Sequence, residues 1–347
     1  MPNYLYNAWY VAALSRELEN APLGRTFLDE PVVLFRQSDG SVAALEDRCC
    51  HRHLPLSCGL VAGDRLQCGY HGLEFDASGT CVSVPGQSRV PPGAAIHSYP
   101  VVEKAGWIWI WMGDAEGVDD AMFPPWPWLE DPAWAVTLPD PFHLACNYRL
   151  VTDNVLDTTH LAYVHRNSIG NAAINEFPSK TERTGNRVTM TRWILDRPPP
   201  PMYKAAGNFE GNVDRWQIVE HDPPCFSVND AGCAVAGTGA PEGDRSRGIT
   251  VKALSAPTPE TQSTTHYFFA FVRDFGHGDD ALEEMMSVGM VDVFREDVVV
   301  FEAQQRMMDL KPNAPSIDIN VDAAPLAARK ALEEMIAAEN ASRDAAG

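Results

Sequence analysis

The segment from Cys49 to His71 decides how the first part of this chain is interpreted. It begins with Cys49-Cys50-His51, continues through sixteen residues, and ends with Cys68-Gly69-Tyr70-His71. Two thiols and two imidazoles therefore arrive on two short segments, each with one cysteine and one histidine. With 8 Cys and 10 His in 347 residues, chance produces this spacing roughly 2 × 10⁻⁴ times per chain of this composition. We therefore interpret these side chains as a metal-binding set.

The mixed pairs favour an iron–sulfur cluster. A Rieske [2Fe–2S] cluster takes two Cys on one iron and two His on the other. The alternative is a Cys₂His₂ zinc site, but a zinc finger keeps Cys with Cys and His with His. Cys50 and His53 are neighbouring donors that could replace the expected ones. We prefer Cys49 with His51, because one intervening residue lets both point the same way. The expected cluster ligands are Cys49, His51, Cys68 and His71.

Composition narrows the class of protein. The chain has 45% hydrophobic and 21% charged residues, and its length suits two domains or one large one. A formal net charge of -20 argues against nucleic acid and against anionic membrane surfaces as partners. There is no run of 18 apolar residues, so we expect no transmembrane helix.

The cysteines indicate a reducing environment. The chain has 8 of them, without the spacing of a small disulfide scaffold, so we expect a cytoplasmic protein. Two are assigned to the cluster. Five others are expected to be buried thiols: Cys58, Cys81, Cys146, Cys225 and Cys233.

Short strand-like runs fill residues 24–111. Asp39-Gly40 and Ser78-Gly79 are typical hairpin turns between them. The expected strands are at 26–28, 32–36, 42–45, 73–75, 81–84 and 107–111. This pattern predicts a small antiparallel β domain over residues 1–122, with the two metal-binding segments as loops at one tip.

Prolines mark the expected domain boundary. The run Pro124-Pro125-Trp126-Pro127-Trp128 interrupts regular structure, so we place a second domain at residues 123–347. The prolines at 198–201 predict an irregular loop within it. The expected later elements are strands at 188–190, 215–219, 226–228 and 266–272, then helices over 283–308 and 323–346. This order predicts an α+β protein in which a twisted antiparallel sheet grips a long helix over a pocket.

A second chemical site follows the boundary, within residues 147–165. Apolar residues recur there at helical spacing, which predicts a helix over most of the segment. Asn154, Asp157 and His160 follow at i, i+3 steps, close to one stripe. His165 would lie about 140° around an ideal helix from His160, so both can bind one metal only if the helix ends or unwinds between them. A lone histidine is usually a hydrogen-bonded core residue, but this combination favours a metal site.

A non-haem iron site with two histidines needs one carboxylate in addition. Asp297 falls on the apolar stripe of the helix expected over 283–308, where an unpaired acid is costly. Glu296 and Asp292 are rival ligands. The alternative role for Asp297 is an ion pair with Arg295 or Arg306.

These motifs resemble those of Rieske non-haem iron oxygenases, and most closely the vanillate and dicamba demethylase group. The resemblance covers nearly the whole chain and implies a Rieske domain followed by a helix-grip (START-like) catalytic domain. Two positions depart from the family pattern, because Cys50 and Gly69 stand where proline is usual.

The resemblance also implies residue roles. The family motif Asp-x-x-His-x4-His matches Asp157, His160 and His165, which makes the two histidines iron ligands. Asp157 would bridge toward a cluster on a neighbouring subunit, and Asn154 would lie near the iron. The family's Glu-Asp pair before an apolar run selects Asp297 as the third ligand. By position, Asn229 and Arg273 are weaker candidates for binding substrate, and for each the role of an ordinary structural residue of the sheet is favoured.

The implied activity is that of a monooxygenase. Electrons would come from NAD(P)H through a separate flavin iron–sulfur reductase, with a ferredoxin as an alternative carrier, because no Gly-rich nucleotide fingerprint follows a strand here. We expect O-demethylation of a vanillate-like methoxylated aromatic acid to a phenol and formaldehyde, in a homotrimer. The alternatives are methyl-group or ring hydroxylation of another aromatic acid or sulfonate, and a Rieske electron carrier without oxygenase activity.

Overall fold

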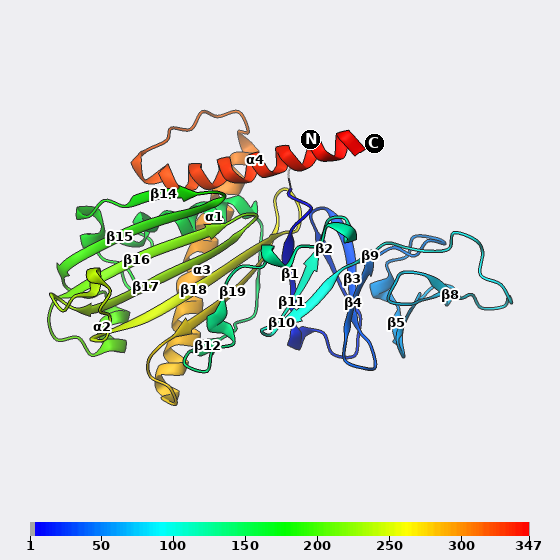
Figure 1. Ribbon diagram of the computed structural model, residues 1–347, viewed down its shortest axis with the longest axis horizontal. Coiled ribbons are helices and arrows are strands. Elements are labelled where there is room, and N and C mark those ends of the chain that lie inside the picture. Colours follow the sequence, from blue (N-terminus) through cyan, green and yellow to red (C-terminus); the bar gives the residue numbers. More distant parts are fainter. Residues whose placement is uncertain (1–3, 347) are drawn as a thin grey trace. The chain divides into compact units, whose positions relative to one another are not determined.

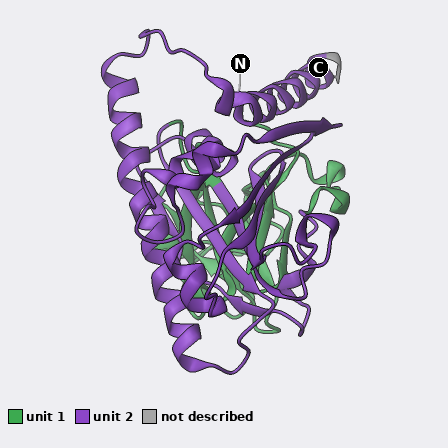
Figure 2. Cartoon of the chain, turned by 90° about the vertical axis from the view of Figure 1, so that its left-hand side faces the viewer, with its two compact units in different colours: residues 1–123, 258–262 green, residues 124–257, 263–347 purple. Residues whose placement is uncertain are grey.

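The computed structural model describes residues 4–346, and the chain divides into two compact units. The first contains residues 1–123 together with Thr258–Gln262, and the second contains Pro124–Pro257 and Ser263–Gly347 (Figure 2). The sequence placed a single boundary between residues 122 and 123. The structure adds a short segment from late in the chain to the first unit.

The first unit consists of three small sheets, in which all the paired strands are antiparallel. The first sheet contains β1 (Trp9–Leu14), β11 (Trp107–Trp111) and β10 (Val101–Lys104). The second contains β2 (Leu23–Phe27), β3 (Glu30–Arg36), β4 (Val42–Glu46) and β9 (Ser98–Tyr99). The third contains β5 (Leu60–Ala62), β6 (Arg65–Gln67), β7 (Glu74–Phe75) and β8 (Cys81–Ser83).

Aromatic residues hold the first of these sheets together. Every residue of β1 and of β11 is buried, as a strand covered on both faces requires. Trp9 lies opposite Trp111 across the strand pair, with ring centroids 5.6 Å apart in an edge-to-face arrangement. The strand expected at 107–111 is therefore present, and the sequence did not predict its partner β1.

The second unit is built on one large sheet with the strand order β12-β19-β18-β17-β16-β15-β14, and β13 also pairs with β19 (Figure 1). Neighbours from β14 to β18 pair antiparallel, as do β12 and β13 with β19. The strands are β12 (Ala135–Thr137), β13 (Phe142–Leu144), β14 (Lys180–Thr184), β15 (Arg187–Arg197), β16 (Val213–Asp222), β17 (Phe226–Val235), β18 (Gly248–Pro259) and β19 (Thr265–Arg273).

The helices complete this unit. The α-helices are α1 (Tyr148–Leu156), α2 (Pro201–Gly207), α3 (Asp280–Leu310) and α4 (Ala323–Ala346). The 3₁₀ turns of the first unit are η1 (Ser15–Glu17), η2 (Leu56–Cys58), η3 (Ala115–Gly117) and η4 (Asp120–Met122). Those of the second unit are η5 (Pro127–Leu129), η6 (Thr158–Ala162), η7 (Ala172–Glu176), η8 (Ala240–Glu242) and η9 (Asn320–Asp322). No α-helix within residues 4–346 is long and apolar enough to cross a membrane.

The long helix α3 crosses one face of the sheet (Figure 1). Its buried residues recur every three or four positions, as an amphipathic helix requires: Met286, Met290, Val293, Asp297, Phe301 and Gln305. Met286, Met290 and Phe301 pack in one cluster with aromatic residues of β19. This arrangement of sheet and helix confirms the predicted α+β, helix-grip class.

Two local predictions need correction. Pro201 begins helix α2 rather than extending an irregular loop, because the first helical position needs no N–H donor and suits the fixed φ of proline. Cys58 is exposed at the end of η2, whereas the other four cysteines expected to be buried thiols are buried.

A glycine in β17 allows the large sheet to pack tightly. Gly232 lies opposite Trp216 of β16, and a Cβ on Gly232 would fall 2.0 Å from Cζ2 of that ring and 2.4 Å from the carbonyl oxygen of Ile249. We therefore predict that Gly232→Ala lowers the free energy of unfolding by about 1–3 kcal/mol, the usual cost of overpacking. Urea denaturation followed by tryptophan fluorescence measures it.

Gly211→Ala is the matched control, because a Cβ there would meet no atom within 4 Å. Its unfolding midpoint should stay close to that of the wild type. Equal midpoints for the two variants would contradict the packing argument.

Candidate metal centres and active site

The first candidate centre is a pair of loops in the first unit. The loop after β4 starts at Cys49, whose N–H donates to the carbonyl of Leu54 at 3.0 Å. The N–H of His53 donates back to the carbonyl of Cys49 at 3.0 Å. His53 adopts a positive φ of 61°, which closes the turn and is uncommon for a residue with a side chain.

The loop between β6 and β7 repeats this backbone pattern. The N–H of Cys68 donates to the carbonyl of Leu73 at 2.8 Å, and the N–H of Gly72 donates to the carbonyl of Cys68 at 3.0 Å. Gly72 has a φ of 71° at the position that corresponds to His53. The two loops are therefore the same turn, used twice to present a cysteine at its first position.

The four donor side chains differ in their exposure to solvent. Cys49 and Cys68 are 2% and 3% exposed, whereas His51 and His71 are exposed, with ring centroids 4.6 Å apart. Burial, reinforced by the neighbouring Cys68, raises the pKa of Cys49 to about 11. The thiolate form therefore needs a bound cation at this position.

The donor geometry argues against a single zinc ion. A zinc ion 2.0–2.3 Å from each ligand would hold all four donor atoms within about 4.6 Å of one another. Within residues 4–346, the one group of three or more His, Cys, Asp or Glu donors within 4.8 Å lies elsewhere in the chain. A set of two buried thiols and two outer imidazoles fits a two-iron cluster instead. Of the neighbouring donors, His53 accepts a hydrogen bond at Nδ1 from Arg48 at 2.9 Å.

The second candidate centre begins where α1 ends. The helix expected over most of residues 147–165 ends at Leu156, and Asp157 takes an extended backbone conformation. The Asp157 carboxylate accepts the N–H of Thr159 at 2.8 Å and so caps the following turn, η6. His160 lies in η6 and His165 beyond it, so the chain is no longer α-helical where the two histidines converge.

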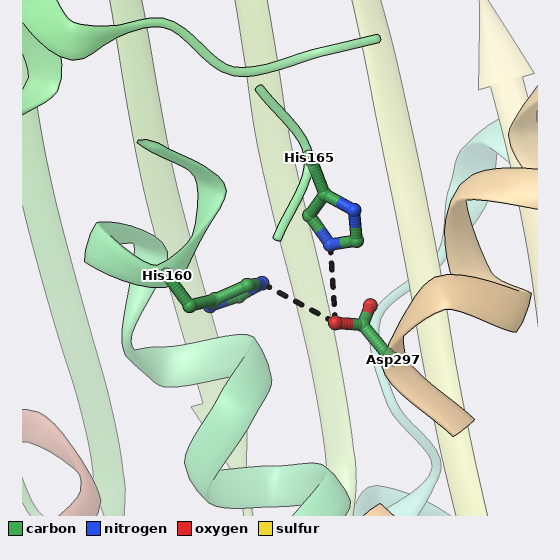
Figure 3. Close-up of side chains that lie close together, drawn as sticks. All are labelled: His160, His165 and Asp297. Atoms are coloured by element: carbon green, nitrogen blue, oxygen red, sulfur yellow. Dashed lines mark ion pairs between the residues drawn. The ribbon is translucent and has the colours of Figure 1, made fainter. Parts of the chain in front are cut away.

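His160, His165 and Asp297 form the group whose donor atoms all lie within 4.8 Å (Figure 3). Nε2 of His165 is 3.1 Å from Oδ1 of Asp297, and Nε2 of His160 is 3.6 Å from the same oxygen. Asp297 comes from α3, more than 130 residues away in the sequence. Two imidazoles and one carboxylate with open positions are the donor set of non-haem iron(II) oxygenases.

Neighbouring groups orient each member of this triad. Nδ1 of His160 donates to the backbone carbonyl of Asp157, and Nδ1 of His165 donates to the Glu296 carboxylate at 2.6 Å. Nδ2 of Asn154 donates to Oδ1 of Asp297 at 3.2 Å. Because each Nδ1 is held by a carbonyl or a carboxylate, Nε2 is the ring nitrogen of each histidine that is directed toward the centre.

The rival acids have other partners. Glu296 is the hydrogen-bond acceptor of His165, and Asp292 pairs with Arg295 at 2.7 Å on the exposed face of α3. Within the described part of the chain, no arginine pairs with Asp297. The alternative in which Asp297 forms an ion pair with Arg295 or Arg306 is therefore not observed.

The two histidines differ electrostatically. Burial lowers the pKa of His160 and outweighs the opposing charge of Asp297, so its imidazole stays neutral, as a metal ligand must be. Burial also disfavours charge on His165. There the hydrogen bond and charge of Asp297, with those of Glu296, prevail and raise its pKa.

A cavity opens beside the triad, between α3 and the inner face of the large sheet. It has about 760 Å³ of space free of protein atoms, open solvent at its mouth included. Its apolar lining comes mainly from β18, α3 and the 155–169 segment: Val155, Leu161, Ile169, Ala231, Val251, Ala253, Met290, Val293, Phe294 and Phe301. The triad residues line the same space.

The two candidate substrate residues differ in position. Asn229 lines the cavity, and its Oδ1 is buried without a hydrogen-bond partner. Arg273 is not part of the lining. Its guanidinium donates to the carbonyls of Phe275 and Gly276 and pairs with Glu283, so it joins the end of β19 to the start of α3. The structure gives Arg273 this structural contact, and a role in substrate binding stays a prediction.

Sequence analysis missed two polar residues of the lining, Arg215 and Gln217 on β16. It recognised the strand and did not single out these side chains. The available signal was their spacing, because residues i and i+2 of a strand point to the same face. Two polar residues on the face that must pack against α3 are unusual in a buried sheet.

Comparison with known families agrees with both centres. Residues 8–100 match the Rieske [2Fe–2S] domain, and residues 144–338 match the vanillate O-demethylase oxygenase C-terminal domain. The chain therefore belongs to the Rieske non-haem iron oxygenases, in the vanillate O-demethylase oxygenase family. It is the iron-containing component of a monooxygenase, and its cofactors are a Rieske cluster and a mononuclear iron.

Individual relatives are similar to this chain over nearly its whole length. It is 42% identical to a putative toluene-4-sulfonate monooxygenase iron–sulfur subunit of Comamonas testosteroni, over 96% of this chain and 97% of that protein. It is 39% identical to a vanillate O-demethylase oxygenase subunit of Pseudomonas sp. strain HR199, over 98% and 97%. The crystal structure of dicamba monooxygenase bound to 3,6-dichlorosalicylic acid superposes with a TM-score of 0.88 at 34% identity, over 97% and 99%.

The Glu296–His165 hydrogen bond gives a test of the triad. We predict that Glu296→Gln weakens Fe(II) binding at the mononuclear site about 10-fold, because a neutral amide holds the imidazole less strongly than a carboxylate does. Competition with a chelator, with the cluster monitored by its absorbance, measures this affinity.

Asp292→Asn is the matched control, since it removes an acid from the exposed side of the same helix. It should leave Fe(II) affinity unchanged. Identical affinity in both variants would show that Glu296 does not support the ligand.

Proposed function

We propose that this protein is the oxygenase component that O-demethylates a methoxylated aromatic acid, vanillate or a close analogue, to a phenol and formaldehyde. The observation that carries the proposal is the His160, His165 and Asp297 group, which opens into a cavity lined largely by apolar side chains, as the sites of small aromatic ligands are. Relatives that act on vanillate and dicamba support the substrate class.

The geometry of the two centres supports the following assignment of metal ligands. Cys49 and Cys68 hold one iron of the cluster, and His51 and His71 hold the other. His160, His165 and Asp297 hold the mononuclear iron. Support comes from the repeated turn that presents the cysteines and from the Nδ1 contacts that leave each Nε2 of the triad histidines available.

The bound metals supply dioxygen activation at the mononuclear iron and single electrons from the cluster. The surrounding residues supply geometry. Asn154 donates to Asp297 and fixes its carboxylate, while Glu296 fixes the ring of His165. Met290, Val293 and Phe294 line the cavity opposite the sheet and limit the access of water to the reacting carbon.

The overall reaction balances with one dioxygen, two electrons and two protons. One oxygen atom replaces a C–H bond of the methoxy methyl by C–OH, and the other leaves as water. The resulting hemiacetal loses formaldehyde and leaves a phenol. The electrons come from NAD(P)H through a flavin iron–sulfur reductase or a ferredoxin, since the sequence has no Gly-rich nucleotide fingerprint of its own.

The assembly is a head-to-tail homotrimer. A heterologous contact that closes into a ring gives every cluster an iron site on the neighbouring subunit. Asp157 bridges the two centres in this arrangement. Its carbonyl already accepts Nδ1–H of His160, and its carboxylate accepts only the N–H of Thr159 among the hydrogen bonds described, which leaves an oxygen for a cluster histidine of the next subunit.

The bridge role predicts that Asp157→Asn keeps both metals and loses about 100-fold in turnover, a large effect for a residue behind the ligands. The asparagine oxygen can still accept the Thr159 N–H, so the cap and the fold are retained. Iron content, the cluster spectrum and steady-state turnover are measured together.

Asp153→Asn is its control, because Asp153 pairs with Arg329 of α4 one turn earlier on α1. It should retain turnover. Wild-type activity in the metal-replete Asp157→Asn protein would exclude the bridge.

Methyl-group hydroxylation of an aromatic sulfonate is the second candidate reaction. The relatives named for toluene-4-sulfonate are 42% and 41% identical to this chain over nearly its whole length. The same metals and cavity serve this chemistry, which converts an aryl methyl to an aryl hydroxymethyl group and releases no formaldehyde. Ring hydroxylation would release no formaldehyde either.

The test is turnover of methoxybenzoates, vanillate included, and of toluene-4-sulfonate with the iron-replete protein, NADH and a flavin iron–sulfur reductase. We expect formaldehyde and a phenolic acid in equal amounts, and neither from the His160→Ala protein, which lacks an iron ligand. A hydroxymethyl product from the sulfonate, without formaldehyde from any methoxy acid, would assign the second reaction instead.

A further inference from the structure

A buried cation faces the cavity of the second unit without a charge partner. Arg215 lies on β16 and is 2% exposed, and it is the one lysine or arginine in the cavity lining. Its Nη2 donates to the carbonyl of Ile169 at 2.9 Å, and its guanidinium lies 5.3 Å from the centre of the Tyr203 ring. Nε and Nη1 have no hydrogen-bond partner.

The acids near Arg215 in sequence and in the sheet are committed elsewhere. Asp214 accepts the N–H groups of Asp196 and Gly237. Asp230 accepts hydrogen bonds from Trp216, Arg245 and Lys252. Trp216 alternates with Arg215 along the strand, so this acidic cluster belongs to the other face of the sheet. No ion pair of Arg215 is found in the described part of the chain.

Gln217 extends the donor surface by one strand step. Its Oε1 accepts from Oγ1 of Thr158 at 3.0 Å and from Arg192 at 3.4 Å. The Thr158 hydroxyl and the Arg192 guanidinium both donate, so the atom that they contact is the amide oxygen of Gln217. Its NH₂ group is not used in these contacts. Nε2 of Gln217 is buried without a partner. Arg215 and Gln217 lie two residues apart on the same sheet face, and both line the cavity with unpaired N–H groups.

A buried, unpaired guanidinium is unfavourable unless a ligand supplies the missing acceptor, because removal of a charge from water has a large cost. Three unpaired donors therefore indicate an anionic acceptor in the cavity. Asn229 lies across the strand pair from Val219, diagonal to Gln217, and its amide can turn either end toward a ligand. Asp297 is the one acid of the lining, and it belongs to the triad.

We propose that Arg215, assisted by Gln217, binds the anionic group of the aromatic substrate and thereby selects ring acids over neutral arenes. A carboxylate and a sulfonate share the needed chemistry, since both present coplanar oxygen pairs that a guanidinium can bind through two N–H groups. The anchored ring then lies in the apolar part of the cavity, with its methyl or methoxy carbon directed to the triad. The inference rests on the proposed function, because it names the substrate feature that this same cavity recognises.

Binding without turnover tests the anchor. Isothermal titration calorimetry under anaerobic conditions uses the holoenzyme with three ligands of matched size: 3-methoxybenzoate, toluene-4-sulfonate and the neutral 3-methoxybenzamide. We expect the wild type to bind one or both anions more tightly than the amide. Arg215→Met should weaken anion binding about 10- to 100-fold, the usual value of hydrogen bonds to a charged group, and change amide binding less than about 3-fold.

Two further variants separate anchoring from structure. Arg215→Lys keeps the cation but loses the two-pronged geometry, so it should retain a weakened preference for the anions. Arg245→Met removes the same charge from the opposite face of the sheet, where Arg245 lies over the Trp216 ring and pairs with Asp230. It should bind all three ligands as the wild type does.

Each outcome decides the proposal. Unchanged anion binding in Arg215→Met, an equal loss for all three ligands, or a wild type without preference for either anion would overturn it. Loss confined to one anion identifies whether the carboxylate or the sulfonate is the natural group. Arg215-dependent binding without formaldehyde from any methoxy acid would refute O-demethylation and leave the anchor established.

Discussion

The carboxylate of Asp297 connects α3 to the segment that contains Asn154, His160 and His165. It lies on the buried stripe of α3, where an acid is tolerated only with partners. The chain supplies them from one short segment, with Asn154 donating to the carboxylate and both histidines presenting Nε2 to the same oxygen. Because that segment runs from the end of α1 into η6, the interaction joins it to α3 beside the cavity. The same contact is the proposed iron site.

The two loops that present Cys49 and Cys68 share one backbone pattern. Each turn is closed by the same two backbone hydrogen bonds around its cysteine and by a residue with positive φ. One loop uses Gly72 for that conformation, while the other uses His53, a residue that adopts it less readily. The repeated turn buries both thiols and leaves both imidazoles at the surface. Exposed imidazoles suit electron transfer, because an electron acceptor can approach them.

The cavity illustrates how function and stability compete. Arg215 and Gln217 occupy positions where apolar side chains would pack better against α3, and their donors are unpaired. Such groups reduce the stability of the empty protein. On the opposite face of the same strands, Asp230 collects several donors and is fully satisfied. The unpaired donors of β16 thus lie on the face of the sheet that lines the cavity.

The sequence by itself determined the metal chemistry and the class of fold, because ligand spacing and helical periodicity are local properties. The Cys-x-His and Cys-x-x-His segments, the His160 and His165 pair, and the stripe holding Asp297 are all legible along the chain. Only the tertiary structure decided that α1 ends before His160, that Arg273 joins β19 to α3, and that Arg215 faces the cavity unpaired. Those facts depend on which face of a strand or helix meets which neighbour. Contacts between residues distant in sequence set them, and no local pattern encodes them.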